Sequence, residues 1–325
     1  MRRREFIALL GGAVTWPMVG LAQRARLYKI GVISAGSVSA SARANPAFVQ
    51  ALSELGWVEG KNILFEYRYA DDRLERLPIF ATELVGLNVD IIVAIGTLAP
   101  IAAKEATSTI PIIMASAGDP FASGLVTNLS RPGGNVTGVS MMSAELGAKR
   151  LQMLKELLPN LSRVAVIWNA VNPYATRDFK ETVGAAQTLG VEVHSIEVRS
   201  PADFANAYEA MTRHRRDALI IVNDPLTGSR YKELADFAIK NLLPSISSYR
   251  EFADAGALIS YGADSADMRR RAASFVDRVL RGEKPGDLPI EQPNKFDLVI
   301  NMKTAKALGL TVPPSLIARA DEVIE

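Results

Sequence analysis

Small and polar residues follow a series of short apolar segments along this chain, and their side chains are of types that bind small molecules. Hydroxyl, amide and carboxylate groups donate and accept hydrogen bonds, and glycines let a ligand approach the backbone. The residues of this kind that we expect to bind a ligand are Gly36, Ser37, Gly96, Thr97, Asp119, Pro120, Asn169, Tyr174, Asn223, Asp224, Ser247 and Ser248.

Gly96 and Thr97 stand where an apolar segment meets a helical pattern. The first turn of a helix offers free N–H groups and the positive end of the helix dipole, which suit a carboxylate. Thr97 would add a hydroxyl donor; alternatively, it only caps the helix. Gly36 and Ser37 have the same position after the first apolar segment.

Asp119 and Asp224 are carboxylates placed directly after apolar segments. A buried carboxylate facing a ligand would pair with an ammonium or hydroxyl group. The alternative for Asp119, which precedes Pro120, is a turn-forming role. Asn223 and Asp224 repeat the arrangement in the second half of the chain.

Trp168, Asn169, Asn172 and Tyr174 form a cluster of rings and amides. Such a cluster can stack on a planar ligand and orient it. For Trp168, a place in the hydrophobic core is the alternative interpretation. Ser247 and Ser248, followed by Tyr249, end another apolar segment.

The sequence offers little for catalysis. His194 and His214 have no metal-ligand spacing and no nucleophile nearby. No phosphate-binding glycine loop or nucleophile elbow occurs. We therefore expect no enzymatic activity, no cofactor and no metal, and we expect both histidines on the surface.

The apolar segments predict strands buried on both faces, as in parallel sheets covered by helices. They lie at residues 30–33, 62–69, 91–95, 111–115, 163–168, 191–197, 218–222, 245–247, 258–261 and 296–300. Helical patterns between them predict two doubly wound, three-layer α/β lobes with parallel sheets, joined by a hinge. Ligands bind at the carboxyl ends of such strands.

Three segments carry more specific expectations. A helix is predicted around residues 46–55, and residues 135–142 read as a first crossing between the lobes because they leave no room for a helix. A basic helix is predicted over 268–281, in which Arg269–Arg271 read as a solvated face and not as an anion site.

The first 22 residues resemble a cleavable export signal, with a basic head, an apolar stretch and a small-x-small end at Ala22. The paired arginines favour a twin-arginine signal; an ordinary secretory signal is the alternative. Cleavage lowers the basic residues from 37 to 34 and the acidic ones from 35 to 34, so the mature chain is neutral. A nucleic-acid partner therefore has no electrostatic basis, and the absence of cysteine excludes disulfides and a lipid-bearing cysteine.

Taken in order, several motifs resemble one known family over almost the whole mature chain: the periplasmic substrate-binding proteins of ABC transporters, in the subgroup with tryptophan- and phenylalanine-binding members. The motifs are Ile95-Gly96-Thr97, Gly118-Asp119-Pro120, Ser130–Gly138, Gly256–Gly262, Phe296–Asn301, Ala305–Leu310 and Pro313-Pro314. The resemblance implies a type I periplasmic-binding fold that closes about a hinge on one small ligand, and an ABC permease as partner. It also adds Gly262 to the expected ligand-binding residues.

The two lobes are expected to have the following boundaries. Lobe 1 is expected to comprise residues 27–138 and about 260–290, and lobe 2 residues 142–258 and about 294–325. The chain departs from the amino-acid binders after Gly262, where Ala263–Asp267 lack the aromatic pair of that subgroup. The expected ligand is accordingly an amino acid or an aromatic or carboxylate compound, with its identity left open.

The leading expectation is a monomeric, soluble periplasmic protein that captures a small organic ligand and delivers it to a permease. A periplasmic sensor that signals to a membrane receptor is the alternative. A repressor-type regulator would need a DNA-binding head where this chain has an export segment, and a hydrolase lacks the catalytic groups.

Overall fold

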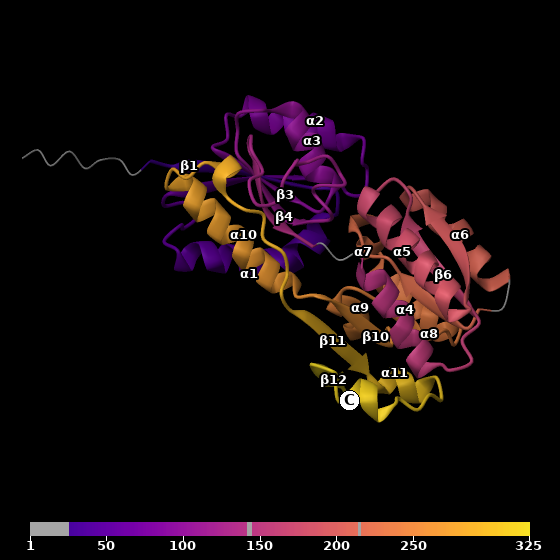
Figure 1. Cartoon of the computed structure of the whole chain (residues 1–325). Coiled ribbons are helices and arrows are strands. Elements are labelled where there is room, and N and C mark those ends of the chain that lie inside the picture. Colours follow the sequence, from indigo (N-terminus) through magenta and orange to yellow (C-terminus); the bar gives the residue numbers. More distant parts are fainter. Residues whose placement is uncertain (1–25, 142–144, 214–215) are drawn as a thin grey trace, which may run out of the picture.

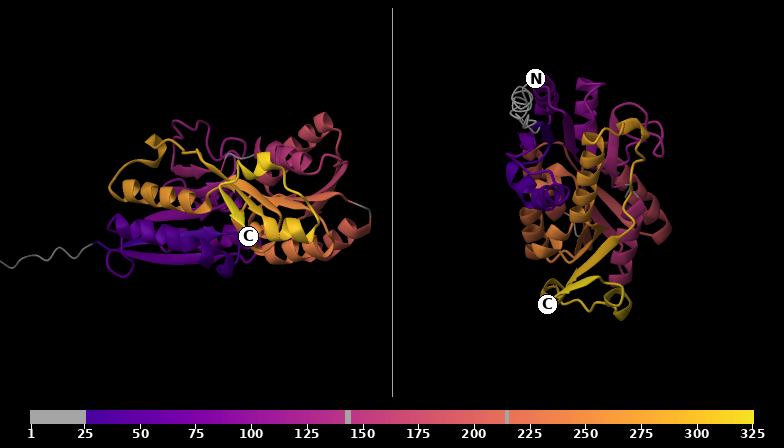
Figure 2. Two further views of the ribbon diagram at one scale, coloured as in Figure 1. Left: turned by 90° about the horizontal axis from the view of Figure 1, so that it is seen from below. Right: turned by 90° about the vertical axis from the view of Figure 1, so that its left-hand side faces the viewer.

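The computed structural model describes residues 26–141, 145–213 and 216–325 as two α/β lobes that lie side by side (Figures 1 and 2). Each lobe is built on one sheet, of five and seven strands respectively. The predicted fold class is therefore confirmed. The predicted export signal, residues 1–22, lies outside the described residues.

Lobe 1 contains a parallel sheet in the order β2-β1-β3-β4-β5. Its strands are β1 (Tyr28–Ser34), β2 (Ile63–Tyr69), β3 (Ile91–Ile95), β4 (Ile112–Ala117) and β5 (Val136–Ser140). Its helices are α1 (Val38–Glu54), α2 (Arg76–Gly86), α3 (Leu98–Ala106), α10 (Ser265–Leu280) and the 3-10 turn η2 (Pro285–Asp287).

Alternate residues of these strands point to opposite faces of the sheet, and both faces are covered. On one face Ile30 and Val93 pack against α1 and α10, through side chains such as Phe48 and Phe275. On the other face the neighbouring strand residues, including Ile92, pack against α2 and α3. Burial on both faces explains why the strands are continuous apolar runs in the sequence.

Lobe 2 contains a sheet in the order β12-β11-β10-β9-β8-β6-β7. Its strands are β6 (Arg163–Asn169), β7 (Glu192–Val198), β8 (Ala218–Ile221), β9 (Ser245–Ser247), β10 (Ile259–Ala263), β11 (Phe296–Asn301) and β12 (Glu322–Ile324). Its helices are α4 (Glu145–Leu157), α5 (Pro173–Leu189), η1 (Pro201–Asp203), α6 (Phe204–Arg213), α7 (Pro225–Ser229), α8 (Tyr231–Lys240), α9 (Arg250–Asp254), α11 (Met302–Ala307) and α12 (Pro314–Ile317).

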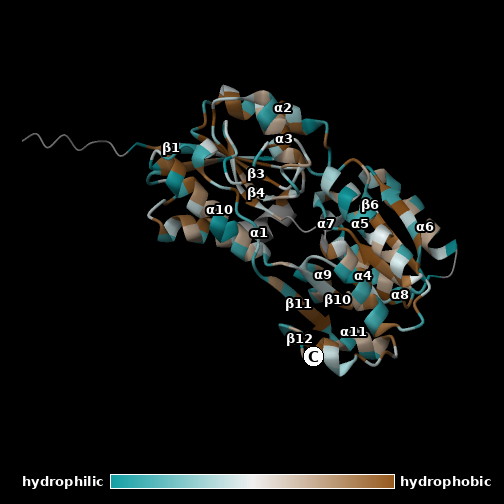
Figure 3. Cartoon of the chain, viewed as in Figure 1, coloured by the Kyte–Doolittle hydropathy of each residue, from teal (hydrophilic) through white to brown (hydrophobic). Residues whose placement is uncertain are grey.

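Most strands of this second sheet are parallel, but β11 runs antiparallel to β10. Helices α4, α5 and α11 cover one face of the sheet, and α6, α8 and α9 cover the other. Figure 3 shows the resulting pattern, with hydrophobic residues along the strands and hydrophilic ones on the outer helix surfaces. No helix in the described part of the chain has both the length and the apolar character needed to cross a membrane.

Two of the predicted segments differ from the structure. Residues 135–142 are not simply a crossing, because Val136–Ser140 pair in parallel with β4 as the edge strand β5. The chain returns from β4 to the parallel strand β5 through a loop. A helix is expected between neighbouring parallel strands, and β5 was therefore not predicted from the sequence. Helix α1 begins at Val38, not near Pro46, and Pro46 lies within it.

The chain crosses between the lobes three times: after β5, between β10 and α10, and between η2 and β11 (Figure 1). The crossing expected at about residue 260 lies after Ala263, since β10 belongs to the second sheet. The last crossing runs beside the end of β5, with Ser140 N donating to Glu291 O at 2.8 Å and Glu291 N donating to Gly138 O at 3.0 Å.

The strand order places a functional edge in each lobe. In sheets of this kind, ligands bind beyond the carboxyl ends of the strands where the winding direction reverses. This reversal falls between β1 and β3 in lobe 1, and between β6 and β8 in lobe 2. The segments after these four strands are those in which the sequence placed most of its polar candidates.

A buried ion pair joins α4 to α5 in lobe 2. The Arg150 guanidinium donates to the Asp178 carboxylate, and both side chains are 0% exposed. Tyr174 Oη donates to the same carboxylate at 3.2 Å. Burial alone would lower the pKa of Arg150, but the neighbouring Asp178 and Tyr174 raise it above its usual value, so the charge is retained.

We expect Arg150→Met to lower the free energy of unfolding of lobe 2 by about 3–5 kcal/mol, because it leaves the Asp178 carboxylate buried without a cation. Urea unfolding followed by the fluorescence of Trp168 measures this change. The Trp168 ring stacks on that of Phe179 of α5, with 4.6 Å between the ring centroids. The double variant Arg150→Met/Asp178→Leu should recover most of the loss, and the exposed Arg213→Met should unfold like the wild type. Equal losses in the single and double variants would contradict the role of the pair.

Candidate functional site

A cavity lies between the lobes and contains about 940 Å³ of empty space, open solvent at its mouth included. It is lined by Ser34, Gly36, Ile95, Gly96, Thr97, Ser116, Met141, Asn172, Tyr174, Asn223, Asp224, Pro225, Gly228, Tyr231, Tyr249, Glu251, Phe252, Ser265 and Arg269. Six of these, Gly36, Gly96, Thr97, Tyr174, Asn223 and Asp224, were predicted from the sequence as ligand-binding residues. Both lobes contribute, and the cavity lies at both reversal points of the strand order.

In lobe 1, hydrogen bonds link the segments that follow β3 and β4 to the end of β5, beside the cavity wall. Gly118 N donates to Thr97 Oγ1 at 3.0 Å, and Ser140 Oγ donates to Gly118 O at 2.7 Å. Thr97 makes no side-chain capping bond to α3, so the capping interpretation of this residue has no support in the structure. Its hydroxyl keeps a proton that it can donate toward the cavity.

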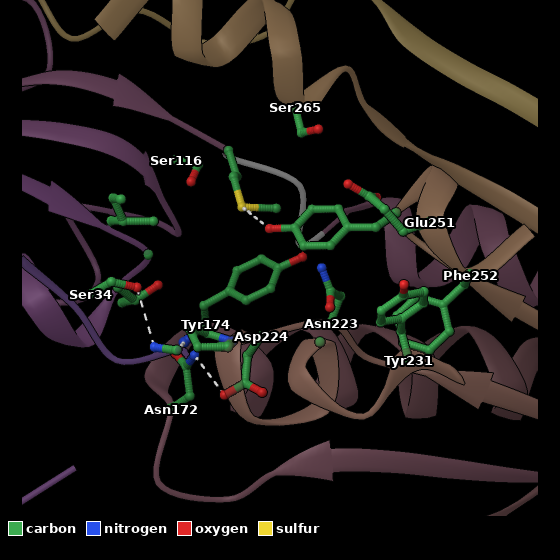
Figure 4. A pocket seen from close by; sticks show the side chains of 18 of the residues that line it. Ser34, Ser116, Asn172, Tyr174, Asn223, Asp224, Tyr231, Glu251, Phe252 and Ser265 are labelled. Atoms are coloured by element: carbon green, nitrogen blue, oxygen red, sulfur yellow. Dashed lines mark hydrogen bonds between the residues drawn. The ribbon is translucent and has the colours of Figure 1, made fainter. Parts of the chain in front are cut away.

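Ser116 is a cavity residue that sequence reasoning missed. Its φ of 68° is unusual for a residue other than glycine, and the register of β4 against β5 shifts between Ala115 and Ala117. The irregularity turns the Ser116 side chain out of the alternating pattern and toward the cavity (Figure 4). Such strain is often found where a side chain has a functional orientation, but a bulge of this kind leaves no mark in the sequence.

Asp224 lies in the wall of lobe 2 and is fully engaged by the protein. Its Oδ2 accepts from the side-chain amides of Asn169 and Asn172, and its Oδ1 accepts from Thr227 N at 3.0 Å. Burial raises the pKa of Asp224, while these hydrogen bonds oppose the shift. The carboxyl group thus orders the surrounding loops, and Asn169, which does not line the cavity, acts from behind it.

Asn223 differs from its neighbour. The residue is 1% exposed, and neither its Oδ1 nor its Nδ2 has a hydrogen-bond partner among the described residues. Asn223 lines the same cavity as Tyr174 (Figure 4). A buried amide that can both donate and accept, and does neither within the protein, is suited to bind a polar ligand group.

Rings and a thioether form the apolar part of the wall. Tyr174, Tyr231, Tyr249 and Phe252 come from lobe 2, and Tyr249 Oη donates weakly to Met141 Sδ at 3.6 Å (Figure 4). Burial raises the pKa of Tyr249 to about 12, so its hydroxyl is uncharged at neutral pH and available as a donor. Such a lining suits a ligand with a planar or apolar portion.

Arg269 and Glu251 bring charge to the cavity, and the sequence did not single out either as a ligand-binding residue. The solvated face expected for Arg269–Arg271 is wrong for Arg269, which is only partly exposed and lines the cavity. Arg270 instead reaches Asp264 and Asp267, and Arg271 pairs with Asp267 and Glu291. Three consecutive arginines of α10 thus differ in their surroundings: Arg269 lines the cavity, whereas Arg270 and Arg271 pair with carboxylates outside it.

The remaining predicted residues lie outside this cavity. Asp119 forms an ion pair with Arg177 of α5, which bridges the two lobes, and Pro120 follows it. Ser37 is next to the lining residue Gly36 but does not line the cavity itself. The role of these three in ligand binding stays a prediction.

Ser247, Ser248 and Gly262 lie farther along the sheet of lobe 2. Ser248 and Gly262 line a second, more polar cavity beside the first, and Gly262 permits close packing because a Cβ there would stand 2.0 Å from Ser248 O. The hydroxyls of Ser247 and Ser248 are buried, with no hydrogen-bond partner among the described residues. Their contact with a ligand is not shown and stays a prediction.

Trp168 and the histidines stand apart from the cavity. Trp168 packs in the core of lobe 2 and donates to Ser195 Oγ at 2.9 Å, which supports the core interpretation. His194 Nε2 lies 3.1 Å from Glu192 Oε1 on β7, and His214 lies outside the described residues. Within the described ranges, no group of three or more histidine, cysteine, aspartate or glutamate side chains could hold a metal ion.

Comparison with known proteins places the chain in a family. The family model described as "ABC transporter substrate binding protein" matches residues 29–324. The chain is 29% identical to a tyrosine-binding protein of Clostridioides difficile (strain R20291), over 82% of this chain and 77% of that one.

Solved structures agree with this match. A conserved domain protein from Vibrio cholerae has a TM-score of 0.86 at 28% identity, covering 91% of this chain and 99% of its own. A Streptococcus pneumoniae ABC domain in complex with L-Trp has a TM-score of 0.84 at 26% identity, with the same coverage. The ligand-free, open structure of a Clostridium difficile substrate-binding protein with adhesive properties has a TM-score of 0.64 at 25% identity, again with the same coverage.

The resemblance drawn from the sequence motifs is confirmed by these matches. Proteins of this kind carry ligands and are not enzymes, in agreement with the expectation from the sequence. Through a match that extends over nearly the whole described chain, the protein belongs to the family of ABC transporter substrate-binding proteins.

Proposed function

We propose that this protein captures an amino acid, or a related aromatic or carboxylate compound, between its two lobes and delivers it to an ABC permease. The observation that carries the proposal is the buried Asn223 amide, whose two polar atoms have no partner in the described structure and which lines the cavity between the lobes. Leaving such a group unsatisfied costs roughly 1–3 kcal/mol. A bound ligand that hydrogen-bonds to Asn223 removes this cost.

The wall around Asn223 favours a ligand that has a ring or another apolar portion. Tyr174, Tyr249 and Phe252 present aromatic surface, while Thr97 and Ser116 present hydroxyls from the opposite lobe. Burying the apolar portion supplies affinity, and the few polar groups set orientation. The tyrosine-binding relative and the L-Trp complex are consistent with such a ligand.

The lobes already touch around the cavity, as they would around a captured ligand. Pro225 of lobe 2 lies against Gly36 and Gly96 of lobe 1, at 3.6 Å and 3.4 Å from the Cβ positions that side chains there would have. Tyr174 lies so close to Gly118 that a Cβ on Gly118 would stand 2.5 Å from Tyr174 Cβ. The greater similarity to the L-Trp complex than to the open, ligand-free relative agrees with a closed arrangement.

Export to the periplasm and delivery to a permease belong to the same proposal. Their support is the signal-like pattern of the first 22 residues and the family match. Deletion of the gene should abolish high-affinity uptake of the bound solute by intact cells. If the protein instead serves as a sensor, deletion will leave uptake unchanged and alter the cell's response to the solute.

Asn223→Leu should weaken ligand binding about 10- to 100-fold while the ligand-free protein stays as stable as the wild type or becomes more so. The reason is that an apolar side chain of similar size removes an unpaired polar group from the free protein and a hydrogen-bonding group from the complex. A thermal-shift panel of amino acids and aromatic acids identifies the ligand, and calorimetry then measures its affinity.

Asn206→Ala, an exposed asparagine on α6, serves as the matched control and should bind normally. Normal affinity in Asn223→Leu would remove Asn223 from the site. If no compound in the panel shifts the melting temperature of the folded wild type, the proposed function itself is contradicted, because a ligand specific for the native state must stabilise it.

Gly118→Ala should weaken binding at least about tenfold by holding the lobes apart. The new methyl group would collide with Tyr174 Cβ, an atom too close to the backbone to move aside, so the closed state becomes less populated and the apparent affinity falls with it. Small-angle scattering with saturating ligand should show a larger radius of gyration than for the wild type. Gly184→Ala, where the structure has open space, is the control; identical behaviour of the two variants would show that closure does not need this contact.

A further inference from the structure

Arg269 is a cation in the cavity wall for which the described part of the protein provides no counterion. The residue lies one turn into α10, and its buried Nε has no hydrogen-bond partner there. Among the same residues, no carboxylate oxygen lies within 4.0 Å of its guanidinium nitrogens. Its neighbours Arg270 and Arg271 both have acidic partners.

The groups that face Arg269 do not neutralise it. Tyr249, Glu251 and Tyr69 interact with it electrostatically, but Tyr249 is uncharged at neutral pH and Glu251 is too distant for an ion pair. Burial lowers the pKa of Arg269, yet a guanidinium remains protonated in proteins. Water can solvate part of the guanidinium, because Arg269 is partly exposed, but its buried Nε has no partner, so an anion bound beside it would stabilise the charge.

We infer that Arg269 binds a carboxylate of the captured solute and makes that carboxylate a requirement for tight binding. The inference rests on the proposed function, because it assigns a role within the same cavity. A guanidinium presents paired N–H donors that match the two oxygens of a carboxylate, whereas an ammonium offers only a point charge. The solute is thereby distinguished from its decarboxylated amine.

The other charges of the cavity favour an anion of single charge. Glu251 and Asp224 also line it, so among the described residues Arg269 is the one cationic side chain in a lining that includes two carboxyl groups. A dianion such as a phosphate monoester would bring a second negative charge that nothing in this lining neutralises. A solute that carries one carboxylate, alone or together with an ammonium group near Glu251, matches the lining better.

The position of Arg269 also connects recognition to closure. Helix α10 packs on α1, β4 and β5 of lobe 1, whereas Asn223 follows β8 of lobe 2. A solute that pairs with Arg269 and hydrogen-bonds to Asn223 therefore contacts both lobes at once. Both interactions can form at once only when the lobes are together. The free energy of the two interactions therefore stabilises the closed state relative to the open one.

The test compares each amino acid with its decarboxylated amine by calorimetry: tyrosine with tyramine, tryptophan with tryptamine, and phenylalanine with phenethylamine. We expect the wild type to bind the acid of at least one pair, and its amine at least about 30-fold more weakly. Arg269→Gln should lower affinity for that acid by a similar factor and leave affinity for the amine unchanged. Arg269→Lys should recover only part of the loss.

Arg270→Gln, on the exposed side of the same helix, is the matched control and should bind as the wild type does. Circular dichroism establishes that each variant is folded; if Arg269→Gln is not, the wild-type acid-to-amine ratio and Arg269→Lys decide. Equal binding of acid and amine by the wild type, or equal losses in Arg269→Gln and Arg270→Gln, would overturn the assignment of Arg269 and leave the proposed function standing. Absence of binding to every member of the three pairs would overturn the inference as tested with these pairs, and the proposed function would be contradicted as well only if no compound of the wider thermal-shift panel binds.

Discussion

The structure depends on a constraint imposed by its sheets: helices cover both faces of each sheet, so only the ends of the strands can bring polar side chains together. Residues such as Ile30, Ile92, Val166 and Ile221 are fully buried between layers and leave no room there for a ligand. The carboxyl ends of the strands point into the gap between the lobes, where the loops present hydroxyls, amides and rings. A cavity with a polar lining between the lobes is the direct outcome of covering both faces of each sheet.

Within this arrangement, some polar groups are bonded within the protein and order the cavity wall, and others have no partner in the described structure. Asp224 is satisfied by Asn169, Asn172 and Thr227, so it orders the loops of lobe 2. Asn223, its immediate neighbour, has no such partners in the described structure. Arg150 and Asp178 stabilise the helix that carries Tyr174 into the wall. Preorganised binding requires a rigid wall whose polar groups are hydrogen-bonded, with a few further polar groups that lack partners.

The sequence allowed the fold class, most strands and part of the cavity lining to be predicted, for physical reasons that also explain the failures. Strands buried on both faces leave a continuous apolar pattern, and the residues after β3 and β8 fall at a cavity edge whatever the details of packing. Ser116 was missed because an irregularity in β4 reverses the direction of its side chain. Arg269 was misread because three consecutive arginines look alike in sequence, and only the rotation of α10 decides which one faces inward. The strand β5 was missed because a loop, and not a helix, precedes it.

The three crossings between the lobes have a mechanical consequence. The last crossing is hydrogen-bonded to the end of β5, the strand that precedes the first crossing, through Ser140 and Glu291, and Arg271 of α10 reaches Asn294 on the last crossing at 2.9 Å. Both contacts fix the last crossing to lobe 1, through β5 and through α10. We therefore expect the lobes to move relative to each other mainly by bending about the crossings. This motion would open and close the cavity that lies between them.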